Sequence, residues 1–131
     1  MDIRESEPPT WNPAQLLEFD ITSNEIRDGL VSFRADTLAF RFTPRPQTAP
    51  VTCTVELREY LGGGSEGSVL LNGTASATVK RNQSSDTWLS FSGFGWQDAT
   101  RTRPVTRCYY RVSLDCDSTV RVAICGEERL F

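Results

Sequence analysis

Cationic and aromatic side chains alternate with apolar ones near the end of the sequence, and this segment is the best suited to binding chemistry. Residues 107–112 read Arg-Cys-Tyr-Tyr-Arg-Val. Successive side chains of a β-strand point to opposite faces, so Arg107, Tyr109 and Arg111 are predicted to share an outer face. Together with nearby arginines they form a predicted basic and aromatic stripe, which consists of Arg101, Arg103, Arg107, Tyr109, Arg111 and Arg121.

Guanidinium groups and a phenol on one face are suited to anionic partners. A nucleic acid, an acidic glycan or the acidic segment of a neighbouring subunit would each fit this chemistry. The formal net charge is −3, which opposes nucleic acid because that binding depends mainly on phosphate neutralisation. Arginines on an exposed strand also serve simply to keep it soluble, and the sequence leaves that alternative open.

The sequence offers little for catalysis. It contains no histidine, which excludes histidine triads and the commonest general base near neutral pH. The cysteines Cys53, Cys108, Cys116 and Cys125 include no C-x-x-C pair, so a zinc site is not expected. They are predicted to be free thiols, with Cys53 and Cys108 as the pair to test for a disulfide. We therefore expect a protein that is not an enzyme and needs neither a metal nor a cofactor.

A cluster of aromatic residues offers a different binding chemistry. Trp88, Phe94 and Trp96 lie close together in the sequence. Flat aromatic rings bind the apolar faces of sugars in β-sandwich proteins. A glycan-binding module is therefore the alternative to a protein-interaction role.

The first fourteen residues are rich in proline and in acidic side chains. Pro8, Pro9 and Pro13 favour extended structure, so residues 1–14 are predicted to form an arm that stays loose by itself. Asn12 followed by Pro13 also resembles a helix start, which predicts a helix of one or two turns.

Three side chains of this arm are suited to docking on another protein. Trp11 can fill a pocket as an anchor, while Glu5 and Glu7 can pair with arginines of the stripe. We therefore expect the arm to become ordered against a neighbouring subunit.

From residue 15 onward, apolar residues recur with the period of two that is typical of β-strands. Strands are expected within 17–21, 31–35, 38–42, 51–58, 69–71, 75–79, 89–91, 108–114 and 120–124. Asn72 and Gly73 are expected to form a tight turn, and residues 115–119 to close a hairpin between the last two strands. The expected core contains Phe40, Phe42, Val55, Leu57, Tyr110, Val112, Val122 and Ile124.

These elements predict one all-β domain over residues 15–131. Its form is expected to be an antiparallel β-sandwich, jelly-roll-like, or a small barrel. No stretch is long and apolar enough for a transmembrane helix or for the core of a secretory signal. We therefore expect synthesis in the cytoplasm without an export signal, and no membrane contact.

In general character, a small β-domain with a proline-rich arm and no evident catalytic residues resembles the small structural proteins of virus particles, including phage capsid decoration and tail components. The resemblance implies a non-enzymatic structural protein of the virion. Such a protein would form homo-oligomers or dock on a larger protein assembly.

Overall fold

Nine β-strands make up the part of the protein that the structure describes. The computed structural model describes residues 2–5, 8–22, 25–33, 37–43, 50–60, 66–80, 85–92, 106–115 and 119–127. Its strands are β1 (Asp2–Glu5), β2 (Pro13–Thr22), β3 (Ile26–Phe33), β4 (Thr37–Thr43), β5 (Val51–Tyr60), β6 (Glu66–Val79), β7 (Thr87–Ser92), β8 (Thr106–Leu114) and β9 (Thr119–Glu127). Within these ranges no helix has the length and apolar character to cross a membrane.

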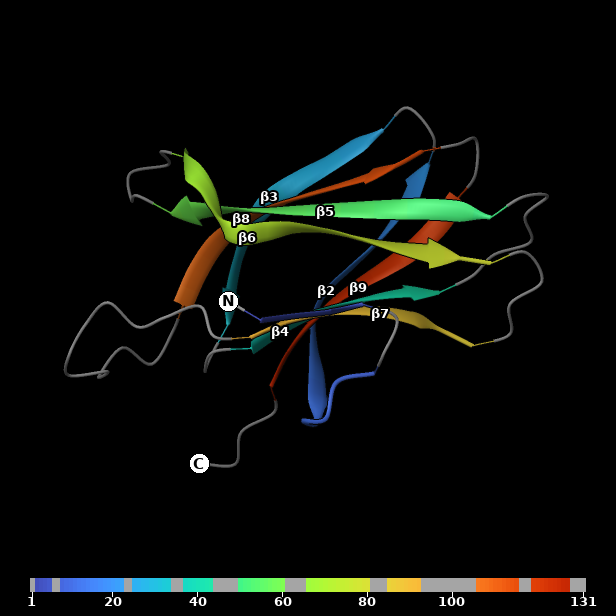
Figure 1. Ribbon diagram of the computed structural model, residues 1–131, viewed down its shortest axis with the longest axis horizontal. Helices are drawn as coiled ribbons and strands as arrows, with labels where there is room; N and C mark the ends of the chain where they lie inside the picture. Colours follow the sequence, from blue (N-terminus) through green and yellow to red (C-terminus); the bar gives the residue numbers. More distant parts are fainter. Residues whose placement is uncertain are drawn as a thin grey trace.

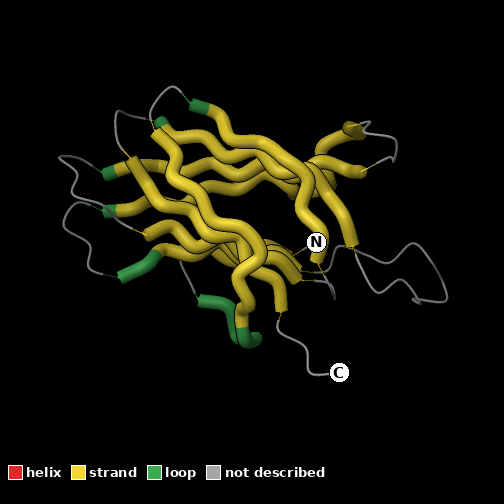
Figure 2. Tube along the Cα trace, turned by 180° about the vertical axis from the view of Figure 1, so that it is seen from behind, coloured by secondary structure: helices red, strands yellow, loops and turns green. Residues whose placement is uncertain are grey.

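The strands form two sheets that pack face to face, as Figures 1 and 2 show. The five-stranded sheet has the order β1-β7-β4-β9-β2, and the four-stranded sheet has the order β3-β8-β5-β6. All paired strands are antiparallel. The predicted all-β antiparallel sandwich is therefore confirmed.

The pairing of strands follows a nested order. β5 pairs with β6, β4 with β7, β3 with β8 and β2 with β9. The chain from β2 to β9 is thus arranged like one long hairpin that is wrapped around a core, so that successive pairs alternate between the two sheets. This order is the jelly-roll topology. β1 adds a further strand beside β7 at the edge of the five-stranded sheet.

The core lies between the two sheets and is built from the inward residues of each strand. All eight residues that the alternation placed in the core are buried, which confirms that prediction. Phe40 occupies its centre, with its ring edge-on to Phe91 at 5.9 Å and to Tyr110 at 6.4 Å between centroids. Such aromatic pairs add to the hydrophobic gain of burial.

A row of side chains fills the space between the edge strands β2 and β3. The Tyr110 ring lies stacked on Phe19 of β2 with centroids 6.0 Å apart, and the Arg27 guanidinium lies 5.7 Å from the centre of the Phe19 ring. Gly29 of β3 is paired with Tyr110, and a Cβ atom there would lie 2.8 Å from the tyrosine hydroxyl oxygen. Glycine therefore leaves the space that the tyrosine needs.

The predicted hairpin between the last two strands is wrong. β8 lies in the four-stranded sheet between β3 and β5, whereas β9 lies in the five-stranded sheet between β4 and β2. The chain passes from one sheet to the other after β8. Alternation buries the same residues in either arrangement, so it could not distinguish a hairpin from a crossing between sheets.

The predicted tight turn at Asn72-Gly73 is also wrong, because both residues lie within β6. Thr74 pairs with Glu56 of β5, but Val69 pairs with Arg58, so four residues of β6 face a single residue of β5. The glycine and asparagine therefore occupy an irregular bulge. Bulges and turns need similar backbone freedom, which explains the error.

The start of the chain differs from the prediction in two ways. No helix forms at Asn12, because β2 begins at Pro13 and pairs with β9 along its length. The extended N-terminal arm is not confirmed, since β1 pairs with β7 and Ile3 packs against the core. In both places, pairing with a neighbouring strand outweighs a local signal.

Candidate interaction surfaces

The outer face of the four-stranded sheet carries the central residues of the predicted stripe. Cys108, Tyr110 and Val112 of β8 are buried in the core, while Arg107 is exposed and Tyr109 and Arg111 are half-buried on the opposite side. The structure therefore places the three side chains of β8 on one outer face, as the alternation predicted. Their role in binding stays a prediction.

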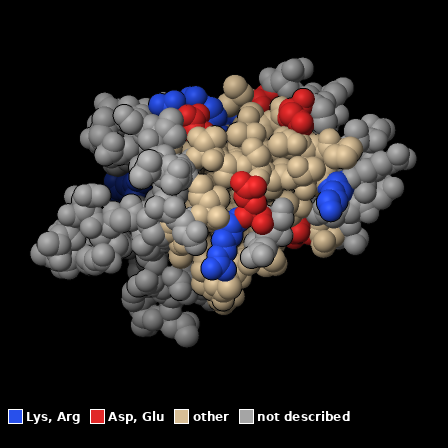
Figure 3. Space-filling model, in the orientation of Figure 1, with Lys and Arg blue, Asp and Glu red and all other residues tan. Residues whose placement is uncertain are grey.

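Acidic residues of the flanking strands lie beside this stripe. The register brings Arg111 between Asp28 of β3 and Glu56 of β5, with nitrogen–oxygen distances of 3.9 and 3.7 Å. Arg58 forms a further ion pair with Glu56 at 2.9 Å. These ion pairs make the stripe mixed in charge, which weakens the case for a polyanionic ligand. Figure 3, which views the sandwich along the edges of its sheets, shows acidic and basic side chains interspersed on that side as well.

Apolar side chains complete the same surface. Ile26 and Leu30 of β3 are 60% and 41% exposed, and Leu30 is paired with Tyr109. We call this surface the β3–β8 face, and it consists of Ile26, Asp28, Leu30, Arg107, Tyr109 and Arg111. The sequence prediction missed its β3 residues because it began that strand at Val31, and because cross-strand neighbours cannot be seen without the register.

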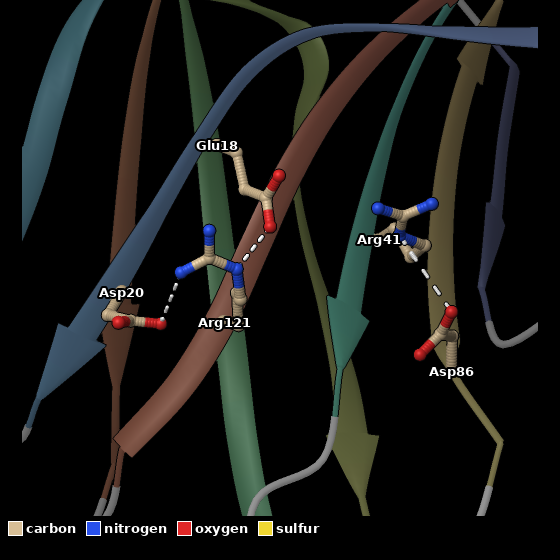
Figure 4. Close-up of polar contacts among 5 residues, drawn as sticks. All are labelled: Glu18, Asp20, Arg41, Asp86 and Arg121. Atoms are coloured by element: carbon tan, nitrogen blue, oxygen red, sulfur yellow. Dashed lines mark hydrogen bonds and ion pairs between the residues drawn. The ribbon is translucent and has the colours of Figure 1, made fainter.

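Arg121 does not belong to this surface. It lies on β9 in the other sheet, where its guanidinium donates hydrogen bonds to the carboxylates of Glu18 and, at 3.3 Å, Asp20 of the neighbouring strand β2 (Figure 4). The hydrogen bond from Arg121 lowers the pKa of the Glu18 carboxyl. The prediction that Arg121 extends the stripe is therefore wrong, because it rested on the hairpin that does not form.

Trp88 lies on the outer side of the five-stranded sheet, away from the stripe. Its neighbours Thr87 and Leu89 are buried, and the Arg41 guanidinium lies 5.8 Å from the centre of its ring. Arg41 also pairs with Asp86 at 3.8 Å, as Figure 4 shows. A sugar that stacked on this face of Trp88 would have to displace Arg41.

Several predicted residues are not brought together. Glu5 is exposed at the end of β1 in the five-stranded sheet, and Trp11 is half-buried in the segment before β2. Neither belongs to the sheet that carries the β3–β8 face. The remaining predicted residues lie outside the described part of the chain, namely Glu7, Phe94, Trp96, Arg101 and Arg103.

The buried cysteines lack the features of a reactive site. Burial raises the pKa of the Cys108 thiol to about 12 and also raises that of Cys125. A thiol with a raised pKa is a weak nucleophile at neutral pH. Across β5 and β8, Cys53 is level with Leu114 and Cys108 with Glu59, so the two cysteines lie about 20 Å apart, far beyond the reach of a disulfide.

We expect Cys108 to resist alkylation in the folded protein. With its pKa near 12 in place of the usual 9.0, the thiolate fraction at pH 8 falls about a thousandfold. The contribution of this neutral thiol to the free energy of unfolding is fully present below pH 9 and is lost as the pH rises towards 12. Iodoacetamide labelling followed by peptide mass spectrometry checks this, with urea-unfolded protein as the control; rapid native labelling of Cys108 would contradict it.

No group of three or more histidine, cysteine, aspartate or glutamate side chains is placed to hold a metal ion within the described ranges. What those ranges do provide is a mixed-charge, partly apolar face on one sheet and an outward tryptophan with paired charges on the other. No family model matches the chain, and no curated protein and no solved structure is significantly similar to it.

Proposed function

We propose that this chain is a non-enzymatic structural protein that assembles with further copies of itself, as a component of a virus particle such as a capsid decoration or tail-associated protein. Viral capsid proteins use the jelly-roll topology, as do lectins and cupins, so the fold supports the proposal without deciding it. The observation that carries the self-assembly is the β3–β8 face.

This face combines the residue types that dominate protein interfaces. Tyrosine and arginine are enriched among the residues that contribute most to binding, and here Tyr109 and two arginines lie beside the exposed Leu30 and Ile26. When a partner removes an exposed leucine or isoleucine from water, the complex is stabilised by about 1 kcal/mol or more. Neighbouring apolar and aromatic groups of this kind favour a protein partner.

The charges of the face favour a second copy as that partner. Two copies related by a two-fold axis bring the same patch together from both sides, so the patch must be complementary to itself. The β3–β8 face carries the 65% exposed Asp28 carboxylate and the exposed Arg107 on the same side of one sheet. Acidic groups of one copy can therefore meet basic groups of the other.

Glycan binding at Trp88 is the second candidate. Its indole faces outward, and the Asp86 carboxylate that pairs with Arg41 beside it is a suitable acceptor for sugar hydroxyl groups. Titration of a glycan panel against the parent protein and Trp88→Ala distinguishes this function, because only stacking on the ring would be lost in the variant.

We expect Leu30→Ser to weaken self-association about tenfold, because it removes an apolar side chain from the centre of the proposed interface. The fold should be unaffected, since Leu30 is 41% exposed. Light scattering over a range of concentrations measures the change. Leu16→Ser is the matched control, because Leu16 is also 41% exposed but lies on β2 of the other sheet.

The parent and the Leu16→Ser variant should both exceed the monomer mass of 14.7 kDa and should form larger assemblies than Leu30→Ser at the same concentration. If the two variants associated equally, the β3–β8 face would not be part of the interface. A parent protein that stays monomeric at every concentration would rule out assembly from copies of this chain.

A further inference from the structure

β1 is an addition to a roll that is complete without it. Each strand from β2 to β9 has its partner in the nested order, and β1 lies at the outer edge against β7. It has four residues, of which Ile3 packs against the core beside Phe91. β1 therefore covers the hydrogen-bonding edge of β7, and edge strands that are left open tend to pair with other chains.

The connection from β1 to β2 is unusually short for the distance it covers. β1 and β2 lie at opposite edges of the five-stranded sheet, separated by β7, β4 and β9. Successive antiparallel pairings make the two strands parallel, and parallel strands of one sheet normally need a connection of about a dozen residues or more. Here seven residues, 6–12, join them.

These seven residues have little length to spare. Four strand spacings separate the two edges, about 19 Å in a flat sheet, and the register places Glu5 level with Leu17, about 10 Å along the strands from Pro13. The connection must therefore cover about 22 Å, while eight residue steps reach at most about 28 Å. Bends at Thr10 and Trp11 use part of that length. Pro8 and Pro9 stiffen the connection, and its residues 8–12 lie on the outer side of the sheet in Figures 1 and 2.

We propose that β1 is exchanged between two copies of the chain, so that Asp2–Glu5 of one copy pairs with β7 of the other. The exchanged strand makes the same hydrogen bonds and the same Ile3 contact, but its connection no longer has to cross its own sheet. Short, constrained connections favour exchange. When a linker barely spans the distance, the effective concentration of the strand at its own sheet is low, so pairing within one chain has little advantage over pairing with a second copy. The inference rests on self-assembly and names a second contact between copies, on the sheet opposite the β3–β8 face.

A cysteine pair across the two strands tests the exchange directly. Arg4 is paired with Ser90, and both lie in the phase opposite to the inward Ile3 and Phe91. Ser90 is also suitable because its hydroxyl has no hydrogen-bond partner among the described residues. Paired residues of antiparallel strands have Cα separations that a disulfide accepts. The doubly substituted full chain, Arg4→Cys with Ser90→Cys, is oxidised at an associating concentration and run on a denaturing, non-reducing gel.

The expected product is a covalently linked dimer. The control pair Thr54→Cys with Ser76→Cys should give cross-linked monomer, because those hydroxyl oxygens lie 3.2 Å apart on β5 and β6 of one chain. Inserting six glycine and serine residues after Glu7 should convert most of the Arg4–Ser90 dimer into cross-linked monomer, because the lengthened connection spans the sheet easily.

The exchange would be overturned if the Arg4–Ser90 pair gave cross-linked monomer and no cross-linked dimer. No cross-link at all would also overturn it, because the β1–β7 register would then be wrong. If the parent still associates in light scattering in either case, self-assembly stands and the exchange alone fails. If the parent is monomeric as well, both proposals fail.

Discussion

Val55→Asp should unfold the protein. Val55 lies in the middle of β5, is fully buried, and is paired with Val112 on one side and Ala75 on the other. An aspartate there would place a carboxylate among apolar side chains, at a cost of about 5 kcal/mol or more. A domain of this size has a free energy of unfolding of only about 5–15 kcal/mol. We expect loss of the cooperative thermal transition followed by circular dichroism.

Thr54→Asp is the matched control for that substitution. Thr54 precedes Val55 on the same strand, but its side chain lies on the outer face, where its hydroxyl is 3.2 Å from that of Ser76. Losing this hydrogen bond costs about 1 kcal/mol, and the new carboxylate stays in water. A Val55→Asp protein that melts close to the temperature of Thr54→Asp would show that the faces of β5 have been assigned the wrong way round.

The faces of the strands could be predicted from the sequence because burial depends on a period of two that each strand carries by itself. Val55 and Leu57 alternate with Thr54 and Glu56, and the structure buries the first pair only. No knowledge of the neighbouring strands is needed for such a prediction. For the same reason, the predicted core residues are buried even where the predicted pairing is wrong.

The pairing of strands could not be predicted in this way. Val112 of β8 and Val122 of β9 are both inward and both buried, yet they belong to opposite sheets. Two strands that face each other across the core show the same alternation as two strands that share an edge. Which arrangement forms depends on the other strands available for pairing, and these are distant in the sequence.

The candidate surfaces follow the same division. Arg107 and Arg111 were placed on their face by alternation within one strand, whereas Arg121 was assigned to it through a pairing that does not form. Asp28 and Glu56, which reduce the basic character of the stripe, come from strands about 80 and 55 residues earlier than Arg111. Only the register of the folded sheet reveals them.

Phe40→Ala should cost about 3–5 kcal/mol of the free energy of unfolding. Phe40 is fully buried at the centre of the core, and its ring contacts those of Phe91 and Tyr110. Removing the ring loses its transfer free energy and leaves a cavity, because the two packed sheets limit how far the neighbours can relax. Urea unfolding followed by tryptophan fluorescence measures the change.

Phe19→Ala is the matched control, because it removes the same ring from the edge of the core. Phe19 is only partly buried and stacks on Tyr110 from β2, with the Arg27 guanidinium beside it. Solvent can enter the space that its ring leaves, so no closed cavity remains. We therefore expect Phe19→Ala to lower the free energy of unfolding by about half as much as Phe40→Ala, or less. Equal losses would contradict the assignment of Phe40 to the centre of the core and of Phe19 to its margin. The difference between the two variants therefore measures how fully the sandwich closes around Phe40, compared with the side where the edge strands β2 and β3 meet.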